Sequence, residues 1–318
     1  MVAAVAPALA PAAVLDLDLG VFAWLLGQAV DPAAALTAPE RQVLAQLDGV
    51  AADASVQGAL LPRAASVVPR LLAQLRGPDC ALSALSDQVS RDMTLVVEVI
   101  RMANSAGYRR GAAVVELEHA VRLLGVDGLR FAIGRAVLKP LMDPRSGALS
   151  AHCARRLWQL TDSKAQLSAA VARGLGCEPF DGYLLGLAHN AVWSVVLRAL
   201  DMARPATTAW HFSAVFVRAL SARRNRLFQV LAQQWQLPQA VREVADEVAD
   251  AVAERSPTDA GGSVLAQALR HGDELASLLC GRDGLQAAAQ AEPLLGALPA
   301  SVRQAWLAQA RSASAAPG

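Results

Sequence analysis

Apolar residues recur every three to four positions along most of this chain, and no stretch alternates apolar and polar residues for long. The first spacing gathers apolar side chains on one face of a helix, whereas strict alternation is typical of a strand. The pattern therefore predicts an all-α fold. It is clearest in three successive stripes: Leu95, Val96, Val99, Ile100 and Ala103; Leu117, Ala120, Val121 and Leu124; and Leu129, Ala132, Ile133, Ala136 and Val137.

Polar residues and glycines mark where these three helices begin and end. Asp92 stands just before the first stripe, where its carboxylate can accept hydrogen bonds from the free N–H groups of the first turn. Asn104 follows that helix and is expected to close it in the left-handed conformation. Gly125 ends the second stripe in the same way, and Asp127 is expected to cap the third helix.

The same periodicity predicts helices over most of the remaining chain. Residues 1–15 are expected to be frayed, and Ser312–Gly318 disordered. Turn-rich breaks are expected at Pro140–Gly147 and Ser256–Ser263. The two helices before residue 58 either pack back on the main body or form a separate docking element. The remaining predicted helices cover residues 19–30, a segment capped by Thr37, 67–75, 148–173, 180–200, 214–234, 238–254, 264–279 and, as two helices, 283–311.

The stretch SRDMTLVVEVIRMANSAGY, followed by ELEHAVRLLGVDGLRFAI, is similar to the HDOD family, the HD-related output domains of bacterial signalling proteins. The order and spacing of several short pieces carry this likeness, which covers roughly residues 58 to 280. It begins at Leu61-Pro62 and continues through Trp158 and Trp235. The pieces are Arg91-Asp92, Asn104-Ser105-Ala106 with Tyr108, Ala120, Leu124-Gly125 and Gly128-Leu129-Arg130.

This resemblance implies a fold of two packed helical sub-bundles, the second similar to a degenerate HD domain. It divides the chain into an N-terminal extension with two helices (1–57), an HDOD-like domain (58–280) and C-terminal helices with a disordered tail (281–318). The halves of the HDOD-like domain would span residues 58–139 and 148–280. The residues to which the resemblance gives a structural role are Asp92, Asn104, Ser105, Gly125, Gly128, Trp235 and Pro238.

The HD phosphohydrolases, after which the family is named, use a His, a His-Asp pair and a distant Asp to hold one or two divalent metals. Such metals lower the pKa of a bound water so that it can attack phosphorus. In this chain the first histidine position, just after Trp158, falls on Leu160 or Thr161. The pair falls on His189, which is followed by Asn190 instead of Asp.

Asp273 is the candidate for the distant aspartate, so one imidazole and one carboxylate remain of that ligand set. A carboxamide lacks the negative charge that binds a hard cation. The sequence therefore predicts no metal, no cofactor and no catalytic residues, and leaves His189, Asn190 and Asp273 as candidates for a vestigial pocket. A lone His on an apolar helix is more often a satisfied core residue than a ligand, and the Asn190 amide is expected to bridge two helices.

Composition narrows the classes of partner. The formal net charge is +1, from 29 basic and 28 acidic residues, so no strongly basic field favours nucleic acid. The four cysteines are scattered, without paired spacing, and are expected to be buried free thiols of a reducing compartment. The N-terminus lacks the basic region of a signal peptide, and no uninterrupted apolar run reaches the ~20 residues of a membrane span. A cytoplasmic protein without a membrane partner is expected.

The resemblance implies a non-catalytic regulatory or scaffold protein of bacterial signal transduction that acts through contacts with signalling proteins. A homo-oligomer is allowed. The expected interface is the crevice between the halves, with the N-terminal helices as second choice. One alternative is a divergent metal-dependent HD-type phosphohydrolase, which requires further His or Asp side chains around His189 and Asp273. Another is a small-ligand sensor that binds a nucleotide in the emptied pocket, with Asn190 and an Arg at its rim.

Overall fold

The computed structural model describes residues 11–52, 82–105, 108–109, 111–142, 147–203, 211–253, 262–280 and 284–315. Within these ranges the chain is helical and forms no strand, apart from one isolated parallel bridge between Asp31 and Ser213. The predicted all-α fold is confirmed. Leu61-Pro62, the helix predicted over residues 67–75 and most of the predicted break at residues 256–263 lie outside the described residues.

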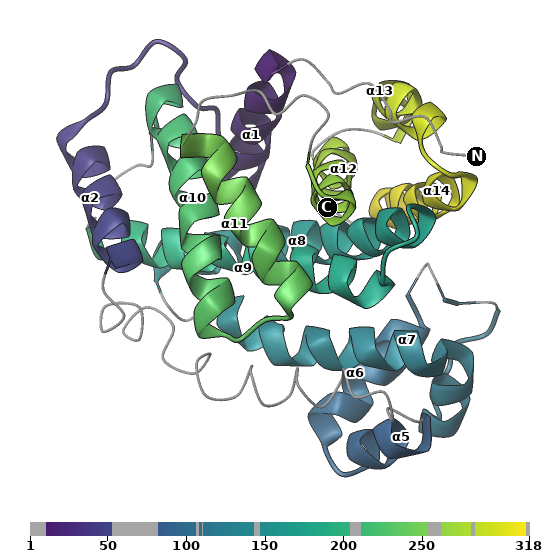
Figure 1. The fold of residues 1–318 in the computed structure, drawn as a ribbon. Coiled ribbons are helices and arrows are strands. Elements are labelled where there is room, and N and C mark those ends of the chain that lie inside the picture. The colour runs from purple at the N-terminus through teal and green to yellow at the C-terminus, as the bar shows by residue number, and fades with distance from the viewer. Residues whose placement is uncertain are drawn as a thin grey trace.

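The described helices follow the predicted ones closely from residue 148 onwards. Figure 1 shows α5–α7 as one group and the remaining helices gathered around α8 and α9. The helices are α1 (Pro11–Leu26), α2 (Ala38–Ala52), α5 (Leu82–Ser90), α6 (Met93–Ala103), α7 (Leu117–Leu138), the short 3-10 helix η1 (Lys139–Met142), α8 (Ala148–Gly174), α9 (Pro179–Ala203), α10 (Ala214–Gln234), α11 (Gln239–Ala253), α12 (Val264–Leu278), α13 (Gly284–Ala297) and α14 (Ala300–Ala315).

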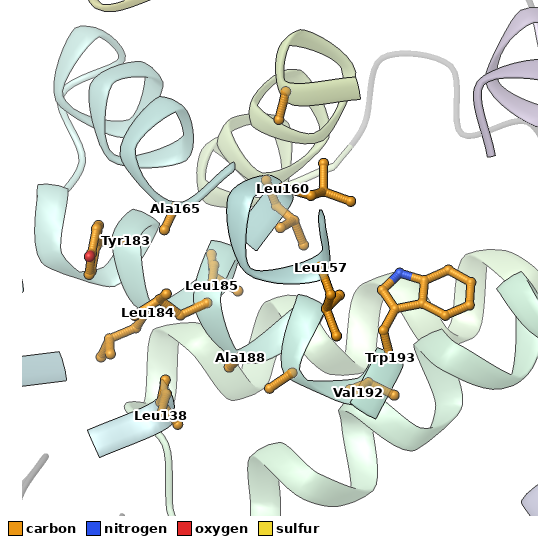
Figure 2. Close-up of a cluster of buried hydrophobic side chains, with 14 of the residues drawn as sticks. Leu138, Leu157, Leu160, Ala165, Tyr183, Leu184, Leu185, Ala188, Val192 and Trp193 are labelled. Atoms are coloured by element: carbon orange, nitrogen blue, oxygen red, sulfur yellow. The ribbon is translucent and has the colours of Figure 1, made fainter. Parts of the chain in front are cut away.

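Helix α9 is the centre of the core. It is long and apolar enough to cross a membrane, but 94% of its most apolar window is buried inside the protein, as in the core helix of a soluble fold. Figure 2 shows its side chains Leu185 and Ala188 among Leu157, Leu160 and Ala165 of α8. Burial of this apolar surface is the main stabilising contribution to the fold.

Glycines let the central helices approach closely. A Cβ on Gly186 of α9 would lie 2.5 Å from the Cα of Ala165 in α8. A Cβ on Gly272 of α12 would lie 2.1 Å from the Oγ of Ser168, also in α8. Both distances are far shorter than any contact that two heavy atoms tolerate. Helices α9 and α12 therefore meet α8 at positions where only glycine fits.

The predicted cap of α6 is present, but the predicted conformation at its other end is wrong. Asp92 Oδ1 accepts from the backbone N–H of Thr94 at 2.8 Å and of Leu95 at 3.4 Å. Asn104 has φ −89° and ψ 0°, which is not left-handed. Its side chain instead binds Val114, with Nδ2 donating to the carbonyl at 2.7 Å and Oδ1 accepting from the N–H at 2.8 Å. That contact with a distant residue closes the helix without a left-handed turn.

The remaining motif residues of the family lie at turns and helix ends. Gly125, with φ 62°, interrupts the helical geometry inside α7, as predicted. The helix continues after Gly125, and Gly128 lies in this second part. The carbonyl of Ser105 accepts from the N–H of Tyr108 at 3.1 Å and so forms a turn. Trp235 is buried at the end of α10, and the carbonyl of Pro238 accepts from the N–H of Arg242 in the first turn of α11 at 2.9 Å.

The N-terminal helices pack back on the main body, which decides between the two alternatives that the sequence left open. Helix α1 begins at Pro11, so the predicted fraying to residue 15 is wrong for its last residues. Phe22 contacts Trp193 of α9, with 5.7 Å between ring centroids. The buried Glu40 of α2 accepts from the N–H of Ser213, the N-cap of α10, at 2.8 Å.

The C-terminal helices extend the same body. Buried Trp306 of α14 donates its indole N–H to the carbonyl of Leu275 in α12 at 3.0 Å. Helix α14 continues to Ala315, so the disorder predicted from Ser312 is wrong for its first four residues. Residues 316–318 lie outside the described ranges.

Candidate functional site

The three residues predicted to share a pocket converge around the side chain of a fourth, Lys164. The Lys164 Nζ of α8 lies 2.6 Å from His189 Nδ1 and 3.3 Å from Asn190 Oδ1, both in α9. It also lies 2.5 Å from Asp273 Oδ1 in α12. We call these four residues the lysine pocket. Its members come from three helices that the chain brings together only on folding.

Lys164 is fully buried, with no exposed side-chain surface. An ammonium group has three N–H donors and no acceptor, and Nζ has three acceptors within hydrogen-bonding distance. A neutral amine would have two N–H groups and would leave one of these acceptors without a donor. The contact with the Asp273 carboxylate further favours the charged form.

The surroundings of His189 fix its neutral form and its tautomer. Burial, reinforced by the positive charges of Lys164 and Arg224, lowers the pKa of His189 well below its ordinary value of 6.5. Since an ammonium can only donate, Nδ1 must be the acceptor and the ring proton is on Nε2. Nε2 lies 3.0 Å from Asn225 Oδ1 in α10 and donates to it.

Asp273 provides the negative charge of the pocket. Burial alone would raise the pKa of its carboxyl, but Lys164 and Arg224 outweigh that effect and lower the pKa below its ordinary range. Its side chain is 28% exposed, whereas that of Lys164 is fully buried, so the pocket meets solvent at Asp273. The four residues of the lysine pocket therefore comprise one ammonium, one carboxylate, one carboxamide and a neutral imidazole, and the positive charge of Arg224 acts on them from nearby.

Asn190 has one satisfied and one unsatisfied end. Its carbonyl oxygen bridges α9 to α8 by accepting from Lys164, in line with the predicted bridging role. Its Nδ2 is buried and has no hydrogen-bond partner. A buried donor without a partner typically costs about 1–3 kcal/mol.

A model of the HDOD domain family matches residues 61–251, which is more than half of the chain. The chain belongs to the HDOD domain family. A protein of uncharacterised function from Treponema pallidum (strain Nichols) is 23% identical to this HDOD protein over 203 residues. The match covers 57% of this chain and 36% of that relative, so the chain spans about a third of the relative's length.

Two solved structures share the fold. A candidate metal-dependent phosphohydrolase from Shewanella amazonensis SB2B is 19% identical and has a TM-score of 0.59, covering 88% of this chain and 99% of the other. An HDOD domain protein of unknown function from Geobacter sulfurreducens is 18% identical and has a TM-score of 0.58, covering 86% and 98%. At such identities, the likeness establishes the architecture of this HDOD protein.

The lysine pocket does not fit a divalent cation. Hard divalent cations need several oxygen or imidazole ligands with net negative charge. This HDOD protein offers one carboxylate, Asp273, and one imidazole, His189, while the ammonium of Lys164 already lies between them. Among the described residues, no group of three or more His, Cys, Asp or Glu side chains could hold a metal.

The prediction for the first histidine position missed the residue that faces the pocket. Leu160 is buried in the apolar core, and the Thr161 hydroxyl donates to the carbonyl of Leu157 at 2.7 Å. The side chain directed at His189 is that of Lys164, one helical turn beyond Leu160. One signal in the sequence could have found it: the chain contains just two lysines among its 29 basic residues, so each lysine stands out.

The second lysine belongs to a polar network at the junction between α5–α7 and α8. Buried Glu98 of α6 binds Lys139 Nζ at 2.6 Å, Arg135 Nε at 3.1 Å and Arg101 Nη1 at 3.1 Å. Arg135 of α7 also pairs with Asp162 of α8. We call these five residues the Glu98 cluster. Burial raises the pKa of Glu98, but the hydrogen bond from Lys139 and the charge of Arg135 outweigh this, so its pKa is lowered.

The three described cysteines and His119 are not part of the lysine pocket. Burial raises the pKa of the Cys153 thiol to about 12, so it is not a thiolate nucleophile at neutral pH. Cys177 and Cys280 are also free thiols, as predicted, but the prediction that they are buried is wrong, because both are partly exposed; Cys80 lies outside the described residues. His119 is exposed, as predicted for the polar side of its helix.

Proposed function

We propose that this HDOD protein is a non-catalytic regulatory module of bacterial signal transduction that acts through contacts with other proteins. One observation carries the proposal: the Lys164 ammonium lies among His189, Asn190 and Asp273, where an HD-type hydrolase would need a metal. A fixed positive charge at that point repels a divalent cation and occupies its ligands. Without a bound metal, no metal-activated water is formed to attack a phosphoester.

The proposal includes a cytoplasmic location and signalling proteins as partners, without nucleic acid or membrane. Family membership supports a signalling role, because the resemblance in sequence is to output domains. The partner interface is expected at the junction between the two helical groups, where the Glu98 cluster lies. Lys139 at its edge keeps 35% of its side chain exposed and could meet a partner there.

The test is elemental analysis of the purified protein together with turnover of a generic phosphodiester. Under the proposal, the protein contains no stoichiometric Mn, Fe or Zn and has no turnover above background. Stoichiometric metal with turnover that His189→Ala abolishes would overturn the proposal and make the protein a divergent hydrolase. The Lys139→Glu variant should capture a partner more weakly than the wild-type protein does. The control is Arg122→Glu, at an exposed position, which should capture the partner as well as wild type does.

A nucleotide sensor is a second candidate, favoured by the unpartnered Nδ2 of Asn190 and by the nearby positive charge of Arg224. Both groups suit an anionic ligand. The measurement is thermal unfolding with nucleoside mono-, di- and triphosphates at millimolar concentration. A shift present in wild type and lost in Asn190→Ala would support this candidate, and no shift with any nucleotide would exclude it.

A further inference from the structure

We infer that Lys164 is a built-in cation that ties α8, α9 and α12 together in the way a structural metal ion ties its ligands. The inference concerns what holds the fold together, so it does not depend on the proposed function. The residues present differ from the HD ligand set. The pocket retains a histidine and a carboxylate from two different helices, and a third helix supplies the positive charge between them.

The geometry resembles coordination more than an ordinary ion pair. A surface ion pair joins two side chains, whereas Lys164 Nζ reaches acceptors of three chemical types at 2.5, 2.6 and 3.3 Å. These acceptors belong to α9 and α12, and the ammonium itself to α8. The Nε2 of His189 is in turn held by Asn225 of α10, as outer hydrogen bonds orient the histidine ligands of metals.

Helix spacing leaves this site little freedom. Gly186 brings α9 against Ala165, the residue after Lys164, and Gly272 brings α12 against Ser168, one turn further along α8. Asp273 directly follows Gly272. The backbone therefore fixes the distance between the ammonium and its acceptors, as a rigid frame fixes the ligands of a metal.

The use of lysine supports a specific role for a compact cation. The chain contains just two lysines among its 29 basic residues, so arginine is its usual cation. A guanidinium is planar and wide, and its five donors suit bidentate partners. An ammonium is a compact point charge whose three donors can meet three acceptors around one centre. That is the arrangement found at Lys164.

Chemical rescue tests the inference. Lys164→Ala removes the three carbons Cγ, Cδ and Cε together with the ammonium and leaves Cβ in place, so n-propylammonium chloride supplies the missing cation with the same number of carbons. Solvent reaches the pocket at Asp273, whose side chain is 28% exposed. We expect Lys164→Ala to lower the Tm by about 5–10 °C, since one partner of a buried charge pair is lost. Propylammonium at tens of millimolar should recover at least half of that loss.

Three controls separate a cation from mere cavity filling. The neutral 1-propanol has the same carbon chain and should rescue little. Lys139→Ala removes the same group from the other lysine and should show no specific rescue by propylammonium. Equal rescue of Lys164→Ala by both compounds, no rescue by either, or an unchanged Tm would overturn the inference.

If Lys164→Ala does not fold, the inference is tested with a second variant, Lys164→Met. Lys164→Met keeps nearly the same side-chain volume and removes only the charge and its donors. A Tm loss of about 5–10 °C in this variant supports the built-in cation, because an apolar chain of equal size does not replace it. A Tm equal to that of wild type, or above it, overturns the inference.

Discussion

The lysine pocket and the Glu98 cluster both contain one of the two lysines of the chain, but they are opposite in charge arrangement. In the lysine pocket a single ammonium is surrounded by acceptors from α9 and α12. In the Glu98 cluster the central carboxylate of Glu98 is surrounded by three cations, Arg135 of α7, Lys139 of η1 and Arg101 of its own helix. The first is a site centred on a cation and the second a site centred on an anion.

The two lysines also differ in how deeply their side chains are buried. Lys164 has no exposed side-chain surface, whereas 35% of the Lys139 side chain is exposed. A charge that can keep part of its hydration loses little when its partner is removed, but a fully buried charge leaves its partners without any replacement. The same residue type therefore stabilises the fold to very different extents at the two sites.

The largest effect is expected from the same substitution at the two lysines. Lys164→Met should lower the free energy of unfolding by about 3 kcal/mol, the low end for a broken buried pair, since Arg224 also offsets the charge of Asp273. Lys139→Met should lower it by less than about 1 kcal/mol, because its side chain is partly exposed. Urea unfolding of both variants measures the difference. Equal losses would remove the distinction between the sites.

An intermediate effect is expected from removing the central anion of the Glu98 cluster. Glu98→Gln keeps the side-chain size but leaves Arg135 with Asp162 as its remaining acidic partner. We expect a loss of about 2 kcal/mol in the free energy of unfolding by the same urea assay. The control is Glu118→Gln, whose partner Arg122 and own side chain are both largely exposed. A loss as small as that of the control would contradict a structural role for Glu98.

The smallest effect concerns pH. The pKa of His189 is lowered in the folded protein from an ordinary value of 6.5, so below pH 6.5 the unfolded chain takes up a proton that the folded protein excludes. The free energy of unfolding therefore falls as pH falls, with a slope from this group of at most about 1.4 kcal/mol per pH unit. His189→Gln should remove that slope between pH 6.5 and 5, whereas the exposed His119→Gln should leave it unchanged. Identical pH profiles would contradict the buried neutral histidine.

Features that depend on neighbouring residues could be predicted from the sequence. The N-cap at Asp92, the break at Gly125 and the bounds of α10 follow from local spacing and backbone preference. Asn104 shows the limit of such reasoning, because Val114, ten residues later, decides its conformation. A rule based on adjacent residues cannot predict a hydrogen bond to a residue that the fold brings close only after an intervening turn of the chain.

The pocket was predictable in part for the same reason. The family pattern places His189, Asn190 and Asp273 in one site, and the structure brings them together. Lys164 stands 25 positions before His189, and its direction depends on the rotation of α8 about its axis. The family pattern places the first histidine position at Leu160 or Thr161, whereas the residue that decides the chemistry lies about one helical turn later, at Lys164.

The hydrogen bond from Trp306 to the carbonyl of Leu275 has a consequence for cooperativity. Leu275 lies two residues after Asp273, so α14 holds the segment of α12 that carries the only carboxylate of the lysine pocket. Local opening of the C-terminal helices would loosen that segment together with its neighbours, as one unit of partial unfolding. The amide hydrogens of α12 should then exchange with solvent at the rate set by α14, although the two helices are separated in sequence by all of α13.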